Sequence, residues 1–412
     1  MILSPSSTTP PKARWLIVTA ILVGLNLRPS MAAIGPLLGD MRGDLGLSYG
    51  SAALLTLLPV TILGLAMFVG LALARRLGER RTLSLALVAI GLASAVRLFV
   101  DHRLSLLLSA AVAGVGIALA QALLPALLKA RFGARVASPI GLYVTAIMGG
   151  AALAASLSPA LAQHLGWRAA LACSGLLAIP ALLLWHVLPR DLLQLPAASA
   201  ATANLRYPRH RRSWLLALYF GLGTASYTCV LAWLAPFYVE QGWSAQRAGL
   251  LLGFLTAMEV VSGLVAPALA NRSRDRRPVL VGLLLAIVGG LLGLVLAPLQ
   301  APWLWAALLG LGIGGLFPLS LIVCLDHLDD PRQAGGLAAW VQGVGYLIAG
   351  LSPWLAGVLR DALGQFAGAW LALAGAMLVL VVLSLRFDPA RYAGLFREAP
   401  RHAAPGPAAP RA

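Results

Sequence analysis

Residues 25–36 read LNLRPSMAAIGP and place Arg28 inside an otherwise uncharged apolar segment that runs from about residue 15 to residue 38. Roughly 20 apolar residues, at about 1.5 Å each, match the hydrocarbon thickness of a bilayer. The segment is therefore predicted to span a membrane with Arg28 near the midplane. An arginine at that depth costs at least about 2.5–3.5 kcal/mol and usually faces a polar cavity or an opposite charge. We interpret Arg28 as a cation beside a solute cavity; the alternative is a structural tie to a neighbouring helix.

The residues around Arg28 favour the cavity. Gly24 and Ala32 fall on the same helix face as Arg28, because an α-helix repeats every 3.6 residues, and their small size leaves room beside the guanidinium. Pro29 and Pro36 each remove a backbone N–H and predict kinks. A membrane tolerates such kinks only where the freed carbonyls meet protein or water.

Composition assigns the chain to the polytopic membrane proteins. Hydrophobic residues make up 60% of the chain and charged residues only 11%, whereas soluble domains are about 25% charged. The net charge of +17 is spread over short loops between apolar runs, which argues against a nucleic-acid-binding surface. The three cysteines lie inside apolar runs and predict neither a disulfide framework nor a metal site. No cofactor is expected.

Twelve apolar runs are long enough to span a bilayer. They are approximately 15–38, 49–74, 82–99, 105–128, 138–162, 167–187, 214–237, 248–270, 278–297, 303–325, 334–358 and 366–385. The predicted fold class is an all-α membrane protein with twelve transmembrane helices in two pseudo-symmetric six-helix bundles.

The distribution of basic residues predicts the orientation. Of the 31 Lys and Arg residues, 24 fall in the two termini and the connections on one side, six fall on the opposite side, and Arg28 is the remaining one. Positively charged loops face the cytoplasm. Both termini are therefore expected in the cytoplasm.

An internal repeat divides the chain at its longest connection, residues 188–213. The pair Arg80-Arg81 returns 196 residues later as Arg276-Arg277, and the motif LSP at residue 157 returns at residue 351. The predicted regions are a cytoplasmic lead at 1–14, a six-helix bundle at 15–187, a cytoplasmic linker at 188–213, a second bundle at 214–387 and a cytoplasmic tail at 388–412, which we expect to be disordered.

Two bundles repeated in parallel are the arrangement of major facilitator transporters. The loop RRLGERR at 75–81 resembles the signature between their second and third helices, although Arg75 stands where an aspartate is expected. The predicted cytoplasmic gate loops contain Arg76, Gly78, Arg80, Arg81, Arg276 and Arg277.

Glu259 is the one carboxylate predicted to lie deep in a span. Its helix face carries Thr256, Ser262 and Gly263, a polar and small stripe that again suggests a cavity. Intramembrane carboxylates relay protons or neutralise cations. We therefore consider a proton-coupling site, a counter-ion for Arg28, and a protonated glutamate bonded to a neighbouring helix.

Uncharged polar residues in the spans complete the candidate site. Small-solute sites combine an apolar pocket with a few convergent hydrogen-bonding groups, although such residues also form ordinary bonds between helices. The candidate substrate-binding residues are Arg28, Asn26, Gln121, Tyr219, Tyr227, Gln342 and Tyr346. No nucleophile, zinc or phosphate-loop motif occurs, so the sequence gives no indication of an enzyme.

Several motifs together resemble one branch of the major facilitator superfamily. They include NLRP at 26–29, IGPLL at 34–38, LLTLLPV at 54–60, GLGIGGLFPL at 310–319 and LDH at 325–327. The chain is similar to bacterial cyanate transporters, in a family that also contains 2-nitroimidazole exporters. The resemblance implies a secondary transporter of the inner membrane, with a central site lined largely by the first, fourth, seventh and tenth helices.

The expected function is alternating-access transport of cyanate or a similar small anion, coupled to protons as a symporter. Arg28 would hold the solute, and Glu259 would take the proton or neutralise the arginine. The alternative is an exporter of a neutral heteroaromatic compound, such as a nitroimidazole or other drug, with Arg28 paired to Glu259. A non-transporting membrane receptor is a further alternative. We expect a monomer in the lipid bilayer, and the sequence leaves the direction of transport open.

Overall fold

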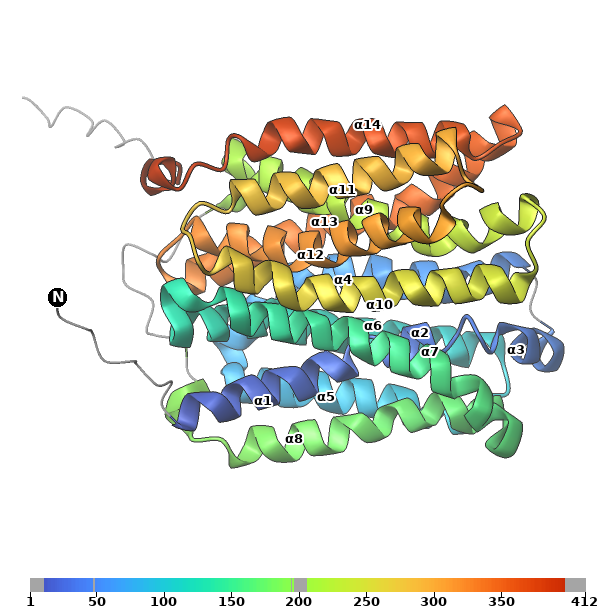
Figure 1. The fold of residues 1–412 in the computed structure, drawn as a ribbon. Helices are drawn as coiled ribbons and strands as arrows, with labels where there is room; N and C mark the ends of the chain where they lie inside the picture. The colour runs from blue at the N-terminus through green and yellow to red at the C-terminus, as the bar shows by residue number, and fades with distance from the viewer. Residues whose placement is uncertain (1–10, 47–48, 194, 196–205, 397–412) are drawn as a thin grey trace, which may run out of the picture.

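The computed structural model describes residues 11–46, 49–193, 195 and 206–396. Its long helices lie side by side with roughly parallel axes (Figure 1). The α-helices are α1 (Pro11–Asn26), α2 (Pro29–Ala32), α3 (Leu38–Leu45), α4 (Tyr49–Leu77), α5 (Glu79–Val96), α6 (Arg103–Phe132), α7 (Ala137–Cys173), α8 (Ala178–Val187), α9 (Arg211–Glu240), α10 (Ala245–Ala270), α11 (Arg277–Leu296), α12 (Pro302–Asp326), α13 (Pro331–Leu363) and α14 (Ala367–Ser384).

The number of membrane crossings agrees with the prediction. In the described part of the chain, ten helical runs are long and apolar enough to cross a membrane. One of these, Ala137–Val187, has 51 residues and holds two crossings, because Gly166 breaks the helix with φ 80° and ψ 160°, a conformation that suits glycine. Helix α4 adds a further crossing through its apolar stretch Leu58–Gly70. The all-α membrane fold of about twelve spans is confirmed.

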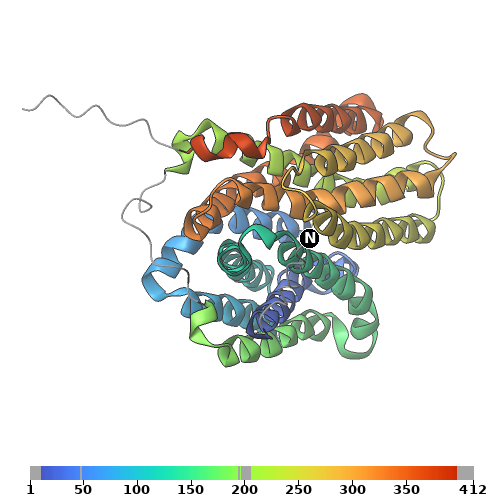
Figure 2. The same ribbon diagram turned by 60° about the vertical axis from the view of Figure 1, so that its left-hand side comes forward.

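Figure 2 shows helices α1 to α8 gathered on one side of the molecule and α9 to α14 on the other. We call these groups the N-terminal half and the C-terminal half. Helix α13 packs against α4 and α6, and α10 and α12 pack against α7, so these six helices form the interface between the halves. The exact region boundaries remain predictions.

The kink predicted at Pro29 is present, because α1 ends at Asn26 and α2 begins at Pro29. One sequence-based expectation needs correction. The start of the tail is not disordered: residues 389–394 form the 3-10 helix η7, where Tyr392 stacks on His327 with 3.9 Å between ring centroids. Residues 1–10 of the lead, 194 and 196–205 of the linker, and 397–412 of the tail lie outside the described residues.

Candidate functional site

The site begins at the break between α1 and α2. Pro29 cannot donate a backbone hydrogen bond, and the helix restarts there, with the carbonyl of Arg28 accepting from the N–H groups of Met31 at 3.0 Å and Ala32 at 2.9 Å. One turn earlier, a Cβ on Gly24 would lie 2.7 Å from the carbonyl oxygen of Tyr143. Glycine at this position therefore lets α7 approach the broken helix closely.

Arg28 projects from this break toward the C-terminal half. Its side chain is half-buried, and Nη2 donates a hydrogen bond of 3.4 Å to the hydroxyl of Tyr346 on α13. The guanidinium carbon also lies 5.6 Å from the centroid of the Tyr346 ring, within cation–π range. In the described part of the chain, Arg28 forms no ion pair with a carboxylate.

Gln121 on α6 shares the same partner. Its Nε2 atom donates to the Tyr346 hydroxyl at 3.3 Å, and its Oε1 atom is buried with no hydrogen-bond partner among the described residues. The structure thus brings together three predicted site residues, Arg28, Gln121 and Tyr346, from both halves of the chain.

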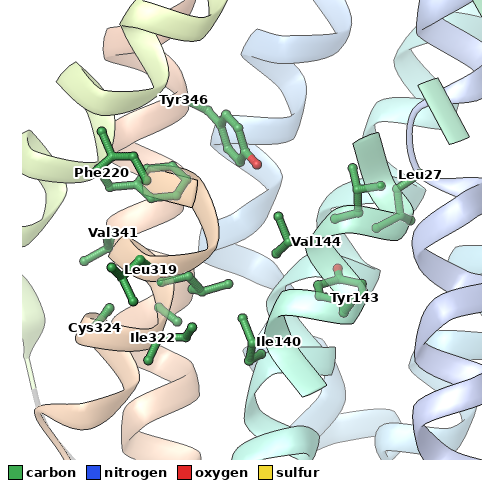
Figure 3. Close-up of a cluster of buried hydrophobic side chains, with 14 of the residues drawn as sticks. Leu27, Ile140, Tyr143, Val144, Phe220, Leu319, Ile322, Cys324, Val341 and Tyr346 are labelled. Carbon is green, nitrogen blue, oxygen red and sulfur yellow. The ribbon is translucent and has the colours of Figure 1, made fainter. Parts of the chain in front are cut away.

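Two further tyrosines lie around the guanidinium. Tyr227 on α9, a predicted site residue, is half-buried and interacts electrostatically with Arg28, Glu259 and Tyr346. Tyr143 on α7 interacts electrostatically with Arg28 and Tyr346, and its buried hydroxyl has no partner among the described residues. Figure 3 shows Tyr346 pointing its hydroxyl toward the helix that carries Tyr143. Sequence reasoning missed Tyr143, for which the only signal was a tyrosine inside a span.

Glu259 lies where α10, α12 and α7 meet. Its side chain is only 2% exposed, and its Oε1 atom has no hydrogen-bond partner among the described residues. A Cβ on Gly314 of α12 would collide with the Glu259 backbone, and one on Gly263 would lie 2.7 Å from Thr145 Oγ1 of α7. Glu259 does not pair directly with Arg28, so the predicted direct counter-ion contact is absent in this conformation. Tyr227 lies near both charged groups.

Asn26 and Tyr219 form no described hydrogen bond with this cluster and instead bond within their own halves. The amide of Asn26 donates to the carbonyl oxygens of Leu22 at 2.9 Å and Leu177 at 2.7 Å, and so ties α1 to the segment before α8. The Tyr219 hydroxyl bonds Ser384 of α14 at 2.8 Å. Both side chains are used in packing between helices of one half.

Gln342 is buried one helical turn before Tyr346 on α13. Its amide contacts the carbonyl oxygen of Ala338 in its own helix at 3.4 Å. Positions four residues apart share a helix face, so Gln342 lies on the same face of α13 as Tyr346. It stays a candidate substrate-binding residue.

The predicted gate loops behave differently in the two halves. Arg276 and Arg277 pair with carboxylates of their own half, Asp326 at 3.0 Å and Asp275 at 2.8 Å. Gly78 has φ 83° and turns the chain into α5, where Arg80 donates to the carbonyl oxygen of His186.

Arg76 and Arg81 are exposed, and no described interaction takes them to the C-terminal half. Within the described residues, the predicted N-terminal gate arginines therefore form no bond between the halves in this conformation.

Two other ion pairs do join the halves. Glu79 accepts from Arg332 of α13 at 3.0 Å, and Lys129 of α6 lies 4.0 Å from Asp326 of α12. Sequence reasoning assigned none of these four residues a role in joining the halves. At the opposite end of the molecule, the described ion pairs stay within one half, as with Arg168 and Asp44 at 2.5 Å. The halves are thus tied at the end that carries the basic loops.

Comparison with known proteins identifies the architecture. Residues 19–353 match the family model described as Major Facilitator Superfamily. The chain belongs to the major facilitator superfamily. The family consists of membrane transporters, which agrees with a polar cluster enclosed between two helical halves.

Full-length relatives place the chain more narrowly. It is 39% identical over 383 residues to the cyanate transport protein CynX of Escherichia coli, covering 92% of this chain and 99% of that protein. It is 30% identical over 374 residues to the 2-nitroimidazole transporter of Escherichia coli, covering 90% and 94%. The family resemblance seen in the sequence is confirmed.

Solved structures share the fold at low sequence identity. The proton:xylose symporter XylE superposes with a TM-score of 0.77 at 14% identity, covering 92% of this chain and 96% of that one. The human organic anion transporter MFSD10 superposes with a TM-score of 0.75 at 16% identity, covering 91% and 100%.

Proposed function

We propose that this major facilitator protein transports cyanate, or a similar small monovalent anion, by alternating access and in symport with protons. The observation that carries the proposal is the environment of Arg28. Its guanidinium is half-buried between the halves and is bonded to a phenol, with no carboxylate paired to it in the described residues. The positive charge therefore remains available to an anionic solute.

The surrounding donors suit a short, linear anion. Cyanate shares its charge between its oxygen and nitrogen ends, so a guanidinium can hold one end while neutral donors hold the other. Gln121, Tyr143 and Tyr346 bring amide and hydroxyl groups from three helices to the same cluster. A few polar groups in an otherwise apolar environment are typical of small-solute sites.

Glu259 is the proposed coupling group. It is buried near the interface between the halves, and its Oε1 atom has no partner among the described residues. Intramembrane carboxylates of this kind relay protons in transporters. Tyr227 lies near both Glu259 and Arg28, so the proposed proton site and the proposed anion site are neighbours.

The competing proposal is export of a neutral heteroaromatic compound, and three tyrosines around one cation give it a stacking surface. That mechanism requires Arg28 to be neutralised internally by Glu259, and no such ion pair exists in this conformation. We therefore favour the anion. We further propose that the protein acts as a monomeric transporter, not an enzyme, in the bacterial inner membrane with both termini in the cytoplasm.

The decisive experiment is flux of labelled cyanate into proteoliposomes under an imposed pH gradient, with a nitroimidazole as competitor. Replacing Arg28 with Gln should lower the affinity for cyanate about 10- to 100-fold, because a hydrogen bond to a charged group contributes about 1.5–3 kcal/mol. Arg247→Gln is the matched control, since Arg247 is exposed and lies against Trp243 outside the cluster. Undiminished uptake by a correctly inserted Arg28→Gln protein would contradict the proposal.

A further inference from the structure

An apolar groove runs along the outer face of the N-terminal half between α5 and α8. These helices lie next to each other in Figures 1 and 2 and are in contact. The groove has a volume of 440 Å³, and its lining includes Leu87, Gly91, Ala95, Cys173, Ile179 and Leu182. Its rim carries Leu92, which is 59% exposed. In a membrane protein, such a surface faces acyl chains.

A basic pocket lies at the end of this groove nearest the chain's arginine-rich loops. It has a volume of 360 Å³ and is lined by Leu77, Arg80, Arg81, Ser84, Leu85 and His186. Leu182 of the groove and His186 of the pocket are four residues apart on α8, about one helical turn of 5.4 Å. The two cavities are thus consecutive parts of one surface between the same two helices.

Among the described residues, no carboxylate pairs with the arginines of this pocket. In the described residues neither Arg80 nor Arg81 forms an ion pair; Arg80 donates to the carbonyl oxygen of His186, and Arg81 is exposed. The repeat-related pair in the C-terminal half, Arg276 and Arg277, binds carboxylates. The difference between the halves indicates that the N-terminal pair is left for an external anion.

We propose that this composite surface binds one anionic phospholipid. The phosphate contacts Arg81 and Arg80 at the membrane interface, and an acyl chain lies in the groove between α5 and α8. Basic pockets between transmembrane helices recognise anionic head groups, and each arginine near the surface contributes attraction. Free phosphate would leave the apolar groove empty. A zwitterionic lipid carries its own positive charge, which the arginines would repel. The lipid site does not depend on which solute the protein transports.

The test is native mass spectrometry of the purified full-length protein, delipidated and titrated separately with phosphatidylglycerol, phosphatidylcholine and glycerol phosphate. Phosphatidylglycerol is expected to bind more tightly than the other two. Arg81→Gln should weaken this binding about fivefold, the effect of one arginine at a membrane surface. Arg272→Gln is the matched control, because Arg272 is an exposed arginine in the corresponding loop of the other half.

A second pair of variants tests the groove. Ala95 is exposed and lines the groove, so Ala95→Phe should exclude the acyl chain and reduce phosphatidylglycerol binding without affecting the fold. Val379→Phe, at a lipid-facing position of α14 that is 52% exposed, should have no effect. Equal binding of the two lipids, equal effects of Arg81→Gln and Arg272→Gln, or equally tight binding of glycerol phosphate would overturn the proposal.

Discussion

The ion pair between Glu79 and Arg332 should stabilise the conformation in which the basic-loop ends of the two halves are closed. These residues are 253 positions apart, and their atoms Oε1 and Nη2 lie 3.0 Å apart. The Glu79 side chain is 10% exposed and that of Arg332 is 26% exposed. We expect Glu79→Gln to shift the equilibrium toward a conformation that is open at this end.

The magnitude follows from the geometry. Two unit charges 3.0 Å apart interact with about 5.5 kcal/mol at an effective dielectric constant of about 20. Desolvation and side-chain ordering cancel much of this energy, which leaves about 1.5–3 kcal/mol for a charged hydrogen bond. Arg332 also donates to the carbonyl oxygen of Leu195 at 3.2 Å. A loss of about 1–2 kcal/mol is therefore expected, which shifts the closed-to-open ratio about 5- to 30-fold.

Pulsed electron spin resonance measures this shift directly. Spin labels at Ala134 and Arg272, two exposed positions on loops of different halves, report the separation of the halves at this end. The three native cysteines are replaced by alanine in every variant. Glu79→Gln should increase the population of long distances, and the charge-reversed pair of Glu79→Arg with Arg332→Glu should restore the short ones.

The matched control for this experiment lies at the other end of the molecule. Glu240 and Arg360 form an ion pair of 2.7 Å within the C-terminal half. Glu240→Gln should therefore leave the distance distribution unchanged. If Glu79→Gln gave the same distribution as the unmodified protein, the pair would not hold the halves together and the reasoning would fail.

Three further predictions concern the site and its surroundings. Tyr346→Phe removes the hydroxyl that accepts from Arg28, and it should raise the KM for cyanate about 2- to 10-fold in proteoliposome flux, the effect of one ordinary hydrogen bond. Glu259→Gln should abolish the response of uptake to an imposed pH gradient while solute still protects the protein against thermal unfolding; a retained pH response would eliminate Glu259 as the coupling group. Tyr219→Phe should lower the free energy of unfolding by about 1 kcal/mol through loss of its hydrogen bond to Ser384, yet leave cyanate flux unchanged. A reduced flux would show that Tyr219 contributes to the transport site.

The fold was predictable because the bilayer imposes it. Each crossing needs about 20 apolar residues, so the spans stand out in the sequence whatever their packing. Their ends were less predictable: the run expected at 334–358 belongs to a helix that covers Pro331–Leu363. Helices extend beyond the hydrocarbon region into the interface, where composition no longer marks them.

The sequence indicated which polar residues could form the site, but not which way their side chains point. Arg28, Gln121 and Tyr346 stood out as polar groups in apolar spans, and they do meet. Asn26 and Tyr219 stood out equally, but they bond neighbouring helices away from the cluster. The difference lies in how each helix is rotated against its neighbours, which depends on tertiary packing and leaves no mark on a single sequence.

The ion pair between Glu79 and Arg332 was unpredictable for the same reason, because its two residues are far apart in the sequence. The sequence drew attention to the arginines of the loop at 75–81, whereas Glu79 is the residue of that loop that contacts the other half. Its partner Arg332 lies at the start of α13, where nothing in the local sequence indicates a contact with α5. Only the assembly of the two halves brings these charges together.

The partners of Arg28 connect the site to the alternating-access cycle. A guanidinium bonded to a phenol keeps its full charge, and sealing such a charge away from water is costly unless an opposite charge accompanies it. A bound anion supplies that charge, so the loaded site can be enclosed between the halves at lower cost than the empty one. If a carboxylate were paired with Arg28, the empty site would already be neutral. A solute anion would then have to displace that carboxylate from the guanidinium. The phenol at Tyr346 thus makes occlusion depend on the solute, which is the condition that a carrier of anions must meet.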